Sequence, residues 1–382
     1  MGREAGGLFS RPLGSRIPTL FPSQQQEAGS HLVQPVRTLL ANLRLRTIPG
    51  LDGIRGISAL CVVAFHGWTE RFPGILAVQT FFVISGLLIT WLLLQEEQQR
   101  GSVNRKAFYV RRAFRLLPAL FLLLVWEAFT DFPHVPRAAI IPSALYYANY
   151  YLIFGGQLIY LGHTWSLAIE EHFYLIWPQI FIFVRNRVNL MWSCFVLAVV
   201  EFVWRVFSST HINYLYGTLA TETTSSAVLI GCGIALLLWH SPNLLPALIL
   251  HRFLAPVSLI LLLLLAQLPN RPQSIWATTA SAPLAAIIVL QAITYEWRIL
   301  ENPVARYLGR ISYGIYLWGF VALGIIRSNR HLGHGYVLLM VVIVLASFSH
   351  YLVERPMQAL GRNLLHSMGA GSSRSSCLKS PA

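Results

Sequence analysis

Three groups of ionisable residues lie inside long apolar stretches, where a charged side chain needs either a partner or a function. The first group is Arg55 and His66, which lie eleven residues apart in LDGIRGISALCVVAFHGW. Eleven residues of α-helix are close to three whole turns, so both side chains face the same way, about 16 Å apart along the axis. An imidazole kept neutral by burial can take a proton from an alcohol, which makes His66 a candidate general base. The alternative is a packed histidine bonded to a carbonyl.

The second group is a set of arginines in FYVRRAFRLLPAL. Arg111 and Arg115 are four residues apart on one face of an expected helix, and Arg112 lies beside them. Guanidinium groups bind phosphate through paired hydrogen bonds, so the cluster is a candidate site for a phosphorylated ligand. The alternative is an anchor that holds this helix end against lipid headgroups at the cytoplasmic face.

The third group is a polar stripe in GHTWSLAIEEHFYLIWP. His163, Ser166, Glu170 and Tyr174 follow one another at intervals of three or four residues, which puts them on one face of a helix. A carboxylate on this face is expected to line a wet cavity. The stripe favours Glu170 over Glu171, because neighbouring helical residues face about 100° apart. The alternative is an ion pair that holds the helices together.

The composition indicates which elements must position these residues. The chain has 382 residues, of which 55% are hydrophobic and 12% charged, so it carries more apolar surface than one soluble core of this length buries. We expect the excess to face the lipid bilayer. The net charge of +14 does not indicate a nucleic-acid partner, because Lys and Arg lie between apolar runs rather than in one polar domain. The four cysteines lack paired spacing, and we expect no metal and no permanently bound cofactor.

Ten stretches are long and apolar enough to cross the hydrocarbon core, which takes about 20 residues of helix. We therefore predict an all-α fold, a polytopic bundle of about ten transmembrane helices. The stretches are roughly 52–69, 75–94, 113–130, 165–184, 189–207, 219–239, 253–268, 275–295, 311–326 and 336–353. An eleventh candidate, 140–154, is rich in tyrosine, which is typical of an interfacial segment.

The distribution of basic residues predicts the orientation. With the N-terminus inside, the inside segments collect about 22 of the 29 Lys and Arg residues, so both termini are predicted to be cytoplasmic. The outside loops then keep about six, which are Arg71, Arg137, Arg205, Arg271, Arg327 and Arg330. Residues 1–47 and 363–382 are expected to be disordered cytoplasmic tails on either side of a membrane domain at 48–362.

Six motifs, in this order along residues 48–362, resemble the acyltransferase-3 family of membrane O-acyltransferases. They are the Arg55–His66 pair, FFVISGLLIT at 81–90, RRAFRLLP at 111–118, HTWSLAIEEHFYLIWP at 163–178, LGRISYGIYLW at 308–318 and VERP at 353–356. The resemblance implies transfer of an acyl group, usually acetyl, from cytoplasmic acyl-coenzyme A to a hydroxyl of a carbohydrate, glycolipid or related acceptor. It also implies a multi-pass protein of the inner (plasma) membrane.

The same resemblance implies roles for single residues. The catalytic residues would be His66, as general base, with Arg55 and Glu170. The residues expected to contact the phosphates of coenzyme A are Arg111, Arg112 and Arg115. The residues expected to shape the acceptor side are Trp165, Ser166 and Tyr174.

Several positions depart from the family's pattern. Gln79 stands where members often carry Asp before FFV, and Gly319 stands where a His often follows the SYxxYLW phrase. Thr224 and Ser226 stand where an Arg and an Asp often open the sixth span, which leaves Glu222 as the nearby acid. These departures bear on acceptor specificity. Because the sequence ends soon after the last expected span, we expect no esterase-like domain of the kind fused to some members.

Two other functions fit part of the pattern. A proton-coupled transporter would use His66, Arg55 and Glu170 as a proton relay, and a structural partner in envelope assembly would need no catalysis. The cytoplasmic arginines favour the acyltransferase, because a proton relay does not need them. No Ser or Cys nucleophile is set beside His66, so direct transfer and an acyl-His66 intermediate both remain open.

Overall fold

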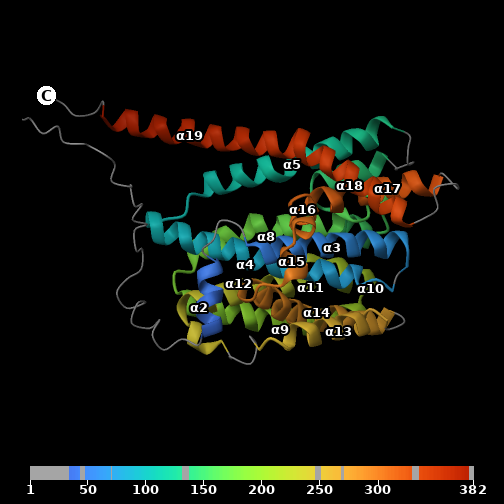
Figure 1. The fold of residues 1–382 in the computed structure, drawn as a ribbon, viewed down its shortest axis with the longest axis horizontal. Helices are drawn as coiled ribbons and strands as arrows, with labels where there is room; N and C mark the ends of the chain where they lie inside the picture. The colour runs from blue at the N-terminus through green and yellow to red at the C-terminus, as the bar shows by residue number, and fades with distance from the viewer. Residues whose placement is uncertain are drawn as a thin grey trace, which may run out of the picture. The chain divides into compact units, whose positions relative to one another are not determined.

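The computed structural model describes residues 34–43, 48–69, 71–130, 137–245, 251–267, 271–328 and 335–377, and these described residues belong to one compact unit. Every regular element in these ranges is a helix, as predicted, and they contain no strand (Figure 1). The longer helices are α2 (Gln34–Leu43), α3 (Pro49–Gly67), α4 (Gly74–Arg100), α5 (Arg105–Phe129), α8 (Thr164–Phe183), α9 (Arg187–His211), α12 (Ser226–His240), α13 (Leu254–Leu265), α14 (Arg271–Thr294), α17 (Ser312–Ser328), α18 (Gly335–Ser349) and α19 (Arg355–Cys377). The shorter α-helices are α6 (Ile140–Ala144), α7 (Ala148–Ile153), α10 (Tyr214–Leu219), α11 (Thr221–Thr224), α15 (Arg298–Glu301) and α16 (Pro303–Arg310).

Four of the described helices are long and apolar enough to cross a membrane. They cover Gly74–Arg100, Arg187–His211, Ile275–Thr294 and Gly335–Ser367. A fifth span results if α16 and α17, which are bent by 73° relative to one another, are counted as one. Helices α3, α5 and α8, of 19, 25 and 20 residues, have similar lengths and carry the ionisable residues singled out above. The chain is therefore built as a helical membrane protein, while the ten spans and the cytoplasmic termini remain predictions.

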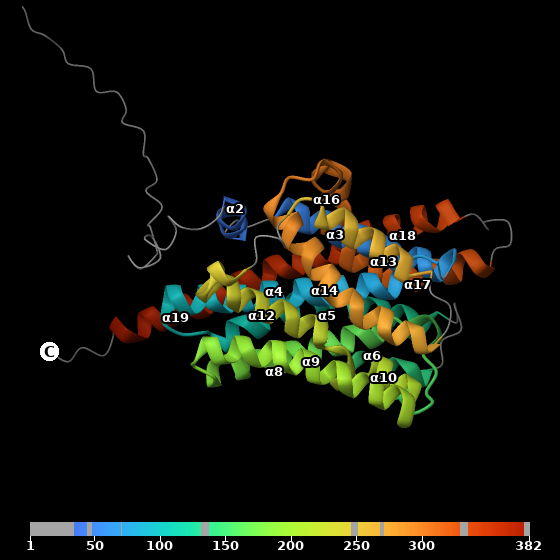
Figure 2. The same ribbon diagram turned by 90° about the horizontal axis from the view of Figure 1, so that it is seen from below.

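Helix α4 lies at the centre of this bundle and packs against α12, α3 and α14. In Figure 2 it lies between α3 above it and α8 and α9 below it. The crossing of α4 and α12 is close because each helix has a glycine there. A Cβ atom on Gly86 would overlap the carbonyl of Val228, and one on Gly231 would overlap the carbonyl of Val83. Because α4 is buried on most sides, its polar side chains face other helices or internal cavities.

The tyrosine-rich segment at 140–154 forms two short helices, α6 and α7, rather than a long span. This agrees with the prediction of a segment that does not cross the membrane. Helix α7 packs against α8 and α10, and α11 packs against α8 and α9. The short helices thus fill the space beside the opening turn of α8.

The last long helix contains an irregular turn. Helix α18 continues into a π-helical turn, η7 (His350–Glu354), and then into α19. Ser349 donates a hydrogen bond to the Glu354 carboxylate at 3.2 Å, and His350 Nδ1 lies 3.2 Å from its other oxygen. Helix α18 packs against α17, whereas α19 packs against α5, and Figure 1 shows α19 and α5 side by side.

Both segments predicted as tails contain described helix. Helix α2 packs against α14, and Asn42 Nδ2 donates a hydrogen bond to the Ile293 carbonyl at 2.6 Å. Helix α19 extends to Cys377. The rest of the two predicted tails, residues 1–33, 44–47 and 378–382, lies outside the described residues.

Candidate active site

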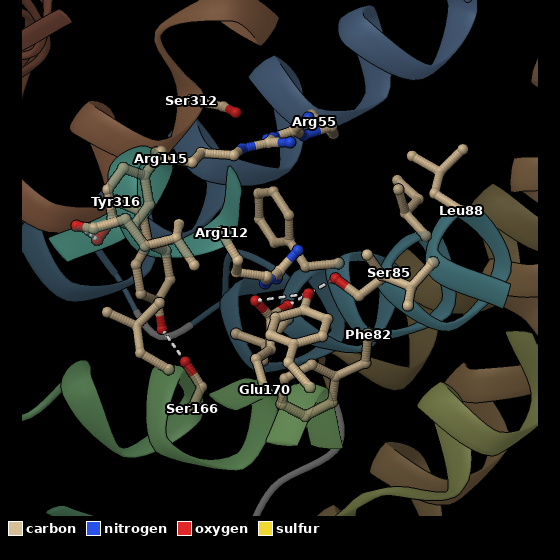
Figure 3. Close-up of a pocket in the computed structure, with 18 of the residues that line it drawn as sticks. Arg55, Phe82, Ser85, Leu88, Arg112, Arg115, Ser166, Glu170, Ser312 and Tyr316 are labelled. Atoms are coloured by element: carbon tan, nitrogen blue, oxygen red, sulfur yellow. Dashed lines mark hydrogen bonds between the residues drawn. The ribbon is translucent and has the colours of Figure 1, made fainter. Parts of the chain in front are cut away.

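A cavity of about 140 Å³, here named the arginine cavity, lies between α3, α4, α5, α8 and α17. Three guanidinium groups line it, Arg55 from α3 and Arg112 and Arg115 from α5. Figure 3 shows these arginines with Glu170 of α8 below them. The other polar side chains of its lining are Ser85, Ser166, Tyr174, Ser312, Tyr313 and Tyr316.

The arginines of α5 divide between two faces of the helix. Arg112 and Arg115 are three residues apart, so one face of α5 carries both into the arginine cavity. Arg111 is not part of the cavity lining; it pairs with Glu96 of α4 at 3.3 Å. The structure thus joins Arg55 to two of the three arginines that the sequence grouped together.

Glu170 is held in the arginine cavity by neutral donors. Ser85 donates a hydrogen bond to one carboxylate oxygen at 3.0 Å, and the Tyr174 hydroxyl donates to the other at 3.3 Å. The Arg112 guanidinium lies over the Tyr174 ring, 2.9 Å from its centroid, and its Nε is 3.8 Å from Glu171. As predicted from the stripe, Glu170 rather than Glu171 lines the cavity.

Two guanidinium groups of the arginine cavity have no carboxylate at ion-pair distance among the described residues. Arg55 and Arg115 form no ion pair within the described part of the chain. Together with Arg112 they outnumber the single carboxylate of the lining, Glu170. Such a cavity is suited to an anion with several oxygen atoms, of which phosphate is the most common biological example.

A second cavity of about 350 Å³, here named the histidine cavity, is lined by His66, His163 and Trp165. Its other polar lining side chains are Gln79, Arg205, Tyr214, Thr218, Thr224, Thr278 and Tyr316, and the lining contains no acidic residue. His66 lies in the last turn of α3, and its side chain is exposed. The helix ends one residue later and leaves this turn open to the cavity, while the ring packs against Phe65 and Phe320.

The two histidines of this cavity lie on either side of one aromatic ring. The Phe320 ring centroid is 4.6 Å from that of His66 and 4.7 Å from that of His163. His163 is only 2% exposed, and its ring nitrogens lie near the Leu317 and Tyr160 backbone without a hydrogen bond of good geometry. The Gln79 side chain is 0% exposed, and neither its nitrogen nor its oxygen has a partner. Buried polar groups are nearly always bonded, so these two call for an explanation.

The two cavities share part of their walls. Val78 of α4 and Tyr316 of α17 line both. The Tyr316 hydroxyl donates a hydrogen bond to the His163 carbonyl at 3.1 Å and lies 2.5 Å from the Ser166 hydroxyl (Figure 3). One side of the boundary is therefore a tyrosine fixed by the opening turn of α8, and the other side is a single aliphatic residue.

Arg205 was assigned to an outside loop, and this was wrong. It lies within α9 and is 2% exposed. Its guanidinium donates to the Thr223 carbonyl and to Thr279 Oγ1, the latter at 3.3 Å, and lies 3.5 Å from Glu201. The residue lies inside the helix, and its partners on the segment at Thr223 and on α14 at Thr279 enclose it. A bonded, paired arginine of this kind supports the wall of the histidine cavity.

A bonded polar network lies where α10 and α11 follow one another. The Tyr150 hydroxyl donates to the Glu222 carboxylate at 2.5 Å, Tyr216 donates to its other oxygen, and Thr221 Oγ1 lies 2.7 Å from His172 Nδ1. Partial burial acts to raise the pKa of Glu222, but the tyrosine hydrogen bonds outweigh it, and the pKa lies below its ordinary value. The bond to Glu222 raises the pKa of Tyr216 to about 12.

The predicted acceptor residues fall into different cavities. Trp165 lines the histidine cavity, whereas Ser166, Glu170 and Tyr174 line the arginine cavity. The last three follow one face of α8 away from its opening turn, and Trp165 is turned about 100° from that face. Glu170, predicted as a catalytic residue, thus lies in the arginine cavity and is separated from Trp165 in the histidine cavity.

Sequence reasoning did not assign a role to Gln79, His163 or Tyr316. A single amide in the apolar stretch before FFVISG was the available signal for Gln79. The described residues contain no group of three His, Cys, Asp or Glu side chains placed to hold a metal ion. The chemistry that the arrangement offers is anion binding in one cavity and proton transfer by an imidazole in the next.

Comparison with known proteins supports the family resemblance that the sequence motifs indicate. Residues 48–352 match the family described as "Acyltransferase domain". The chain is 31% identical over 359 residues to the Bacillus subtilis protein named "Putative peptidoglycan O-acetyltransferase YrhL", which covers 83% of this chain and 56% of that protein. It is 26% identical over 357 residues to "Peptidoglycan O-acetyltransferase OatA" of Listeria monocytogenes, covering 82% of this chain and 56% of that protein. The chain thus spans just over half the length of these relatives. No solved structure matches it significantly.

Proposed function

Because the chain belongs to the acyltransferase-3 family, whose domain it matches over residues 48–352, we propose that it is a membrane O-acyltransferase acting on a carbohydrate of the cell envelope. The acyl group, in the first instance acetyl, comes from acyl-coenzyme A. The acceptor is a sugar hydroxyl, and the relatives named for peptidoglycan O-acetylation make a peptidoglycan glycan the first acceptor to test. The proposed location is the plasma (inner) membrane.

The observation that carries this proposal is the shared boundary of the two cavities. The arginine cavity offers cations for the phosphates of coenzyme A, and the histidine cavity offers an exposed imidazole in a space of about 350 Å³. Val78 and Tyr316 line both spaces, so a thioester arriving from the first reaches the edge of the second. Two substrates held on either side of one boundary gain the rate advantage of proximity.

In the proposed mechanism, His66 takes the proton of the acceptor hydroxyl as its oxygen attacks the thioester carbon. Coenzyme A then leaves through the arginine cavity. The arrangement supports direct transfer, because acceptor and donor have separate spaces that meet. A covalent acyl-His66 intermediate would instead predict labelled protein when the acceptor is absent.

The test is transfer of radiolabelled acetyl from acetyl-coenzyme A by membranes that contain the protein. Wild type is compared with His66→Ala and with His240→Ala, and lipid and polysaccharide fractions are counted separately. His240 is the matched control, because it is also an exposed histidine in the last turn of a helix, α12, but lines neither cavity. We expect label in the polysaccharide fraction with wild type and His240→Ala, and loss of about 10²–10⁴-fold with His66→Ala.

Two results would contradict the proposal. If wild-type membranes transfer no label from acetyl-, propionyl- or butyryl-coenzyme A to any fraction, the protein is not an acyl-coenzyme A-dependent acyltransferase. If His66→Ala transfers label as fast as His240→Ala, the enzyme stands but His66 is not its base. A proton-coupled transporter, the alternative considered from the sequence, predicts the first result.

A further inference from the structure

Acyl transfer from a thioester has a requirement that neither His66 nor the arginines meet. When the acceptor oxygen attacks the carbonyl carbon, negative charge develops on the carbonyl oxygen, and enzymes stabilise it with fixed hydrogen-bond donors. The arginine cavity binds the anionic part of the donor, and His66 handles the proton. The missing part is a donor in the histidine cavity that has no other partner.

The Gln79 side chain has the properties of such a donor. It lines the histidine cavity together with His66, it is 0% exposed, and its Nε2 has no hydrogen-bond partner. It follows Val78 on α4, and Val78 lines both cavities. The amide is thus placed beside the boundary at which the thioester arrives. Leaving an amide unbonded in a buried site costs stability, which favours a functional reason for it.

A second buried glutamine, which lines neither cavity, has hydrogen-bond partners for its side-chain amide. Gln291 of α14 is also 0% exposed, but its Nε2 donates to the His251 carbonyl at 2.8 Å and its Oε1 accepts from the Ala255 backbone N–H at 3.2 Å. These bonds tie α14 to the start of α13. The two amides differ in whether they face a cavity, and only the one that does is unbonded.

Two other side chains of this cavity have buried nitrogens without a hydrogen bond, Arg205 at Nη2 and His163. Arg205 Nη2 lies 3.5 Å from the Glu201 carboxylate, so it is already paired with a charge. His163 suits the task less well than Gln79. An imidazole donates from a given nitrogen in only one of its neutral tautomers, whereas the Gln79 amide always carries N–H groups. The His163 ring also lies against Phe320, at 4.7 Å between centroids with an interplanar angle of 21°.

We propose, on the basis of the proposed acyltransferase function, that the Gln79 Nε2–H group is the oxyanion-stabilising donor of the reaction. The acceptor oxygen bonds to the thioester carbon, its proton passes to His66, and the carbonyl π pair moves onto the oxygen that Gln79 binds. When this pair returns, the C–S bond breaks, and the thiolate of coenzyme A takes the proton from His66. Gln79 is then a catalytic residue specific to a sequence that carries an amide at this position.

The test compares Gln79→Met, Gln79→Glu and Gln79→Asn with Gln291→Leu in the membrane assay, at saturating and limiting acetyl-coenzyme A. Met and Glu match the size of Gln but have no N–H group. We expect both to lower kcat by about 10²–10³-fold with the KM for acetyl-coenzyme A changed less than threefold. Gln79→Asn keeps the amide on a shorter arm and should recover at least tenfold over Gln79→Met.

The control separates this role from a structural one. Gln291→Leu breaks two bonds and should lower the melting temperature while the turnover of the folded fraction stays within twofold of wild type. The inference is overturned if Gln79→Met or Gln79→Glu keeps kcat within threefold of wild type, or if they raise KM without lowering kcat. If wild type itself transfers nothing from any acyl-coenzyme A, the proposed function fails and this inference falls with it. Should Gln79→Met not fold, Gln79→Leu decides, because it also has no hydrogen-bond donor.

Discussion

The two cavities meet at one boundary but treat their polar groups differently. In the arginine cavity, Glu170 accepts hydrogen bonds from Ser85 and Tyr174, and Arg112 lies on the Tyr174 ring. In the histidine cavity, the Gln79 amide is buried without a hydrogen bond. The difference holds for these side chains and not for each whole lining, since Ser312 Oγ of the arginine cavity is also buried without a hydrogen bond. A bonded carboxylate such as Glu170 fixes part of the charge pattern before any ligand arrives. An unbonded amide such as Gln79 keeps its hydrogen bonds for the reacting atoms.

One residue in the wall of the histidine cavity, Arg205, allows this contrast to be tested. Arg205 lines it but is bonded to Thr223 and Thr279 and paired with Glu201. If bonded groups are structural and unbonded ones functional, Arg205 should matter for stability and not for turnover. The predictions below follow from this contrast and run from the largest expected effect to the smallest.

Replacing Arg205 with Met should destabilise the protein by about 3–5 kcal/mol, because it leaves the Glu201 carboxylate buried without its counter-ion. Thermal unfolding in detergent measures the loss. The double variant Arg205→Met, Glu201→Leu should regain most of it, because no unpaired charge remains. If the Arg205→Met protein is as stable as wild type but has a lower turnover, a bonded group acts in the reaction. That result would contradict the assignment of bonded groups to stability and of unbonded groups to turnover.

Arg115→Ala should weaken binding of coenzyme A by about 10–100-fold, since one charge-assisted hydrogen bond is worth about 1.5–3 kcal/mol. Isothermal titration of the purified protein with coenzyme A gives the dissociation constant. Arg111→Ala is the matched control, and its change should stay below threefold because Arg111 pairs with Glu96 outside the cavity. If the two variants lose the same affinity for coenzyme A, the arginines attract the ligand by their overall positive charge and not by hydrogen bonds in the cavity.

Val78→Ala should relax the acyl-length preference, because the boundary between the cavities is lined there by one aliphatic side chain. We expect the rate with butyryl-coenzyme A relative to acetyl-coenzyme A to rise about tenfold, the scale of one or two methylene groups in an apolar site. The control is Leu88→Ala, since Leu88 lines the arginine cavity alone. An unchanged ratio in Val78→Ala would show that the acyl group does not pass this residue.

The Glu222 network should give a small pH dependence of stability at both extremes. The pKa of Glu222 is lowered, so its contribution is present above the ordinary carboxyl pKa near 4.5 and is lost as the pH falls below it. The pKa of Tyr216 is raised to about 12, so its contribution is lost as the pH rises through about 12. The acid side is tested by the melting temperatures of wild type and of the double variant Tyr150→Phe, Tyr216→Phe between pH 3 and pH 7. If the two proteins show the same dependence of melting temperature on pH, the hydrogen bonds to Glu222 do not stabilise the fold.

The sequence predicted the helical fold and the family because both depend on local signals. Long apolar runs indicate membrane helices, and the motifs fall in order along one chain. The stripe through Glu170 was correctly placed on a cavity-facing side, whereas the i to i+4 spacing put Arg111 on one face with Arg115, and the structure places Arg112 and Arg115 in the cavity. These are features of a single helix, and a single helix can be analysed from its residues alone.

The division into two cavities could not be predicted in the same way, because it depends on how helices far apart in sequence pack. Trp165 and Ser166 are neighbours, yet they line different spaces together with residues of other helices. The bonding state of Gln79 depends on what α3, α8 and α17 present to it. Arg205 was misplaced because its burial depends on partners from other segments, Thr223 and Thr279, which the sequence does not place beside it.

The π-helical turn at His350–Glu354 sets the rotational phase of the helix that follows it. Each π turn holds one residue more than an α turn, which rotates all later side chains by about 100° about the axis. Beyond it, Gly361 lies so close to α5 that a Cβ atom would be 2.8 Å from the Phe114 Cβ. Deleting one residue within the turn would leave α18 in place but turn Gly361 away and bring a bulkier neighbour towards Phe114. The fit between the last helix and the helix that carries the arginines thus depends on a single inserted residue.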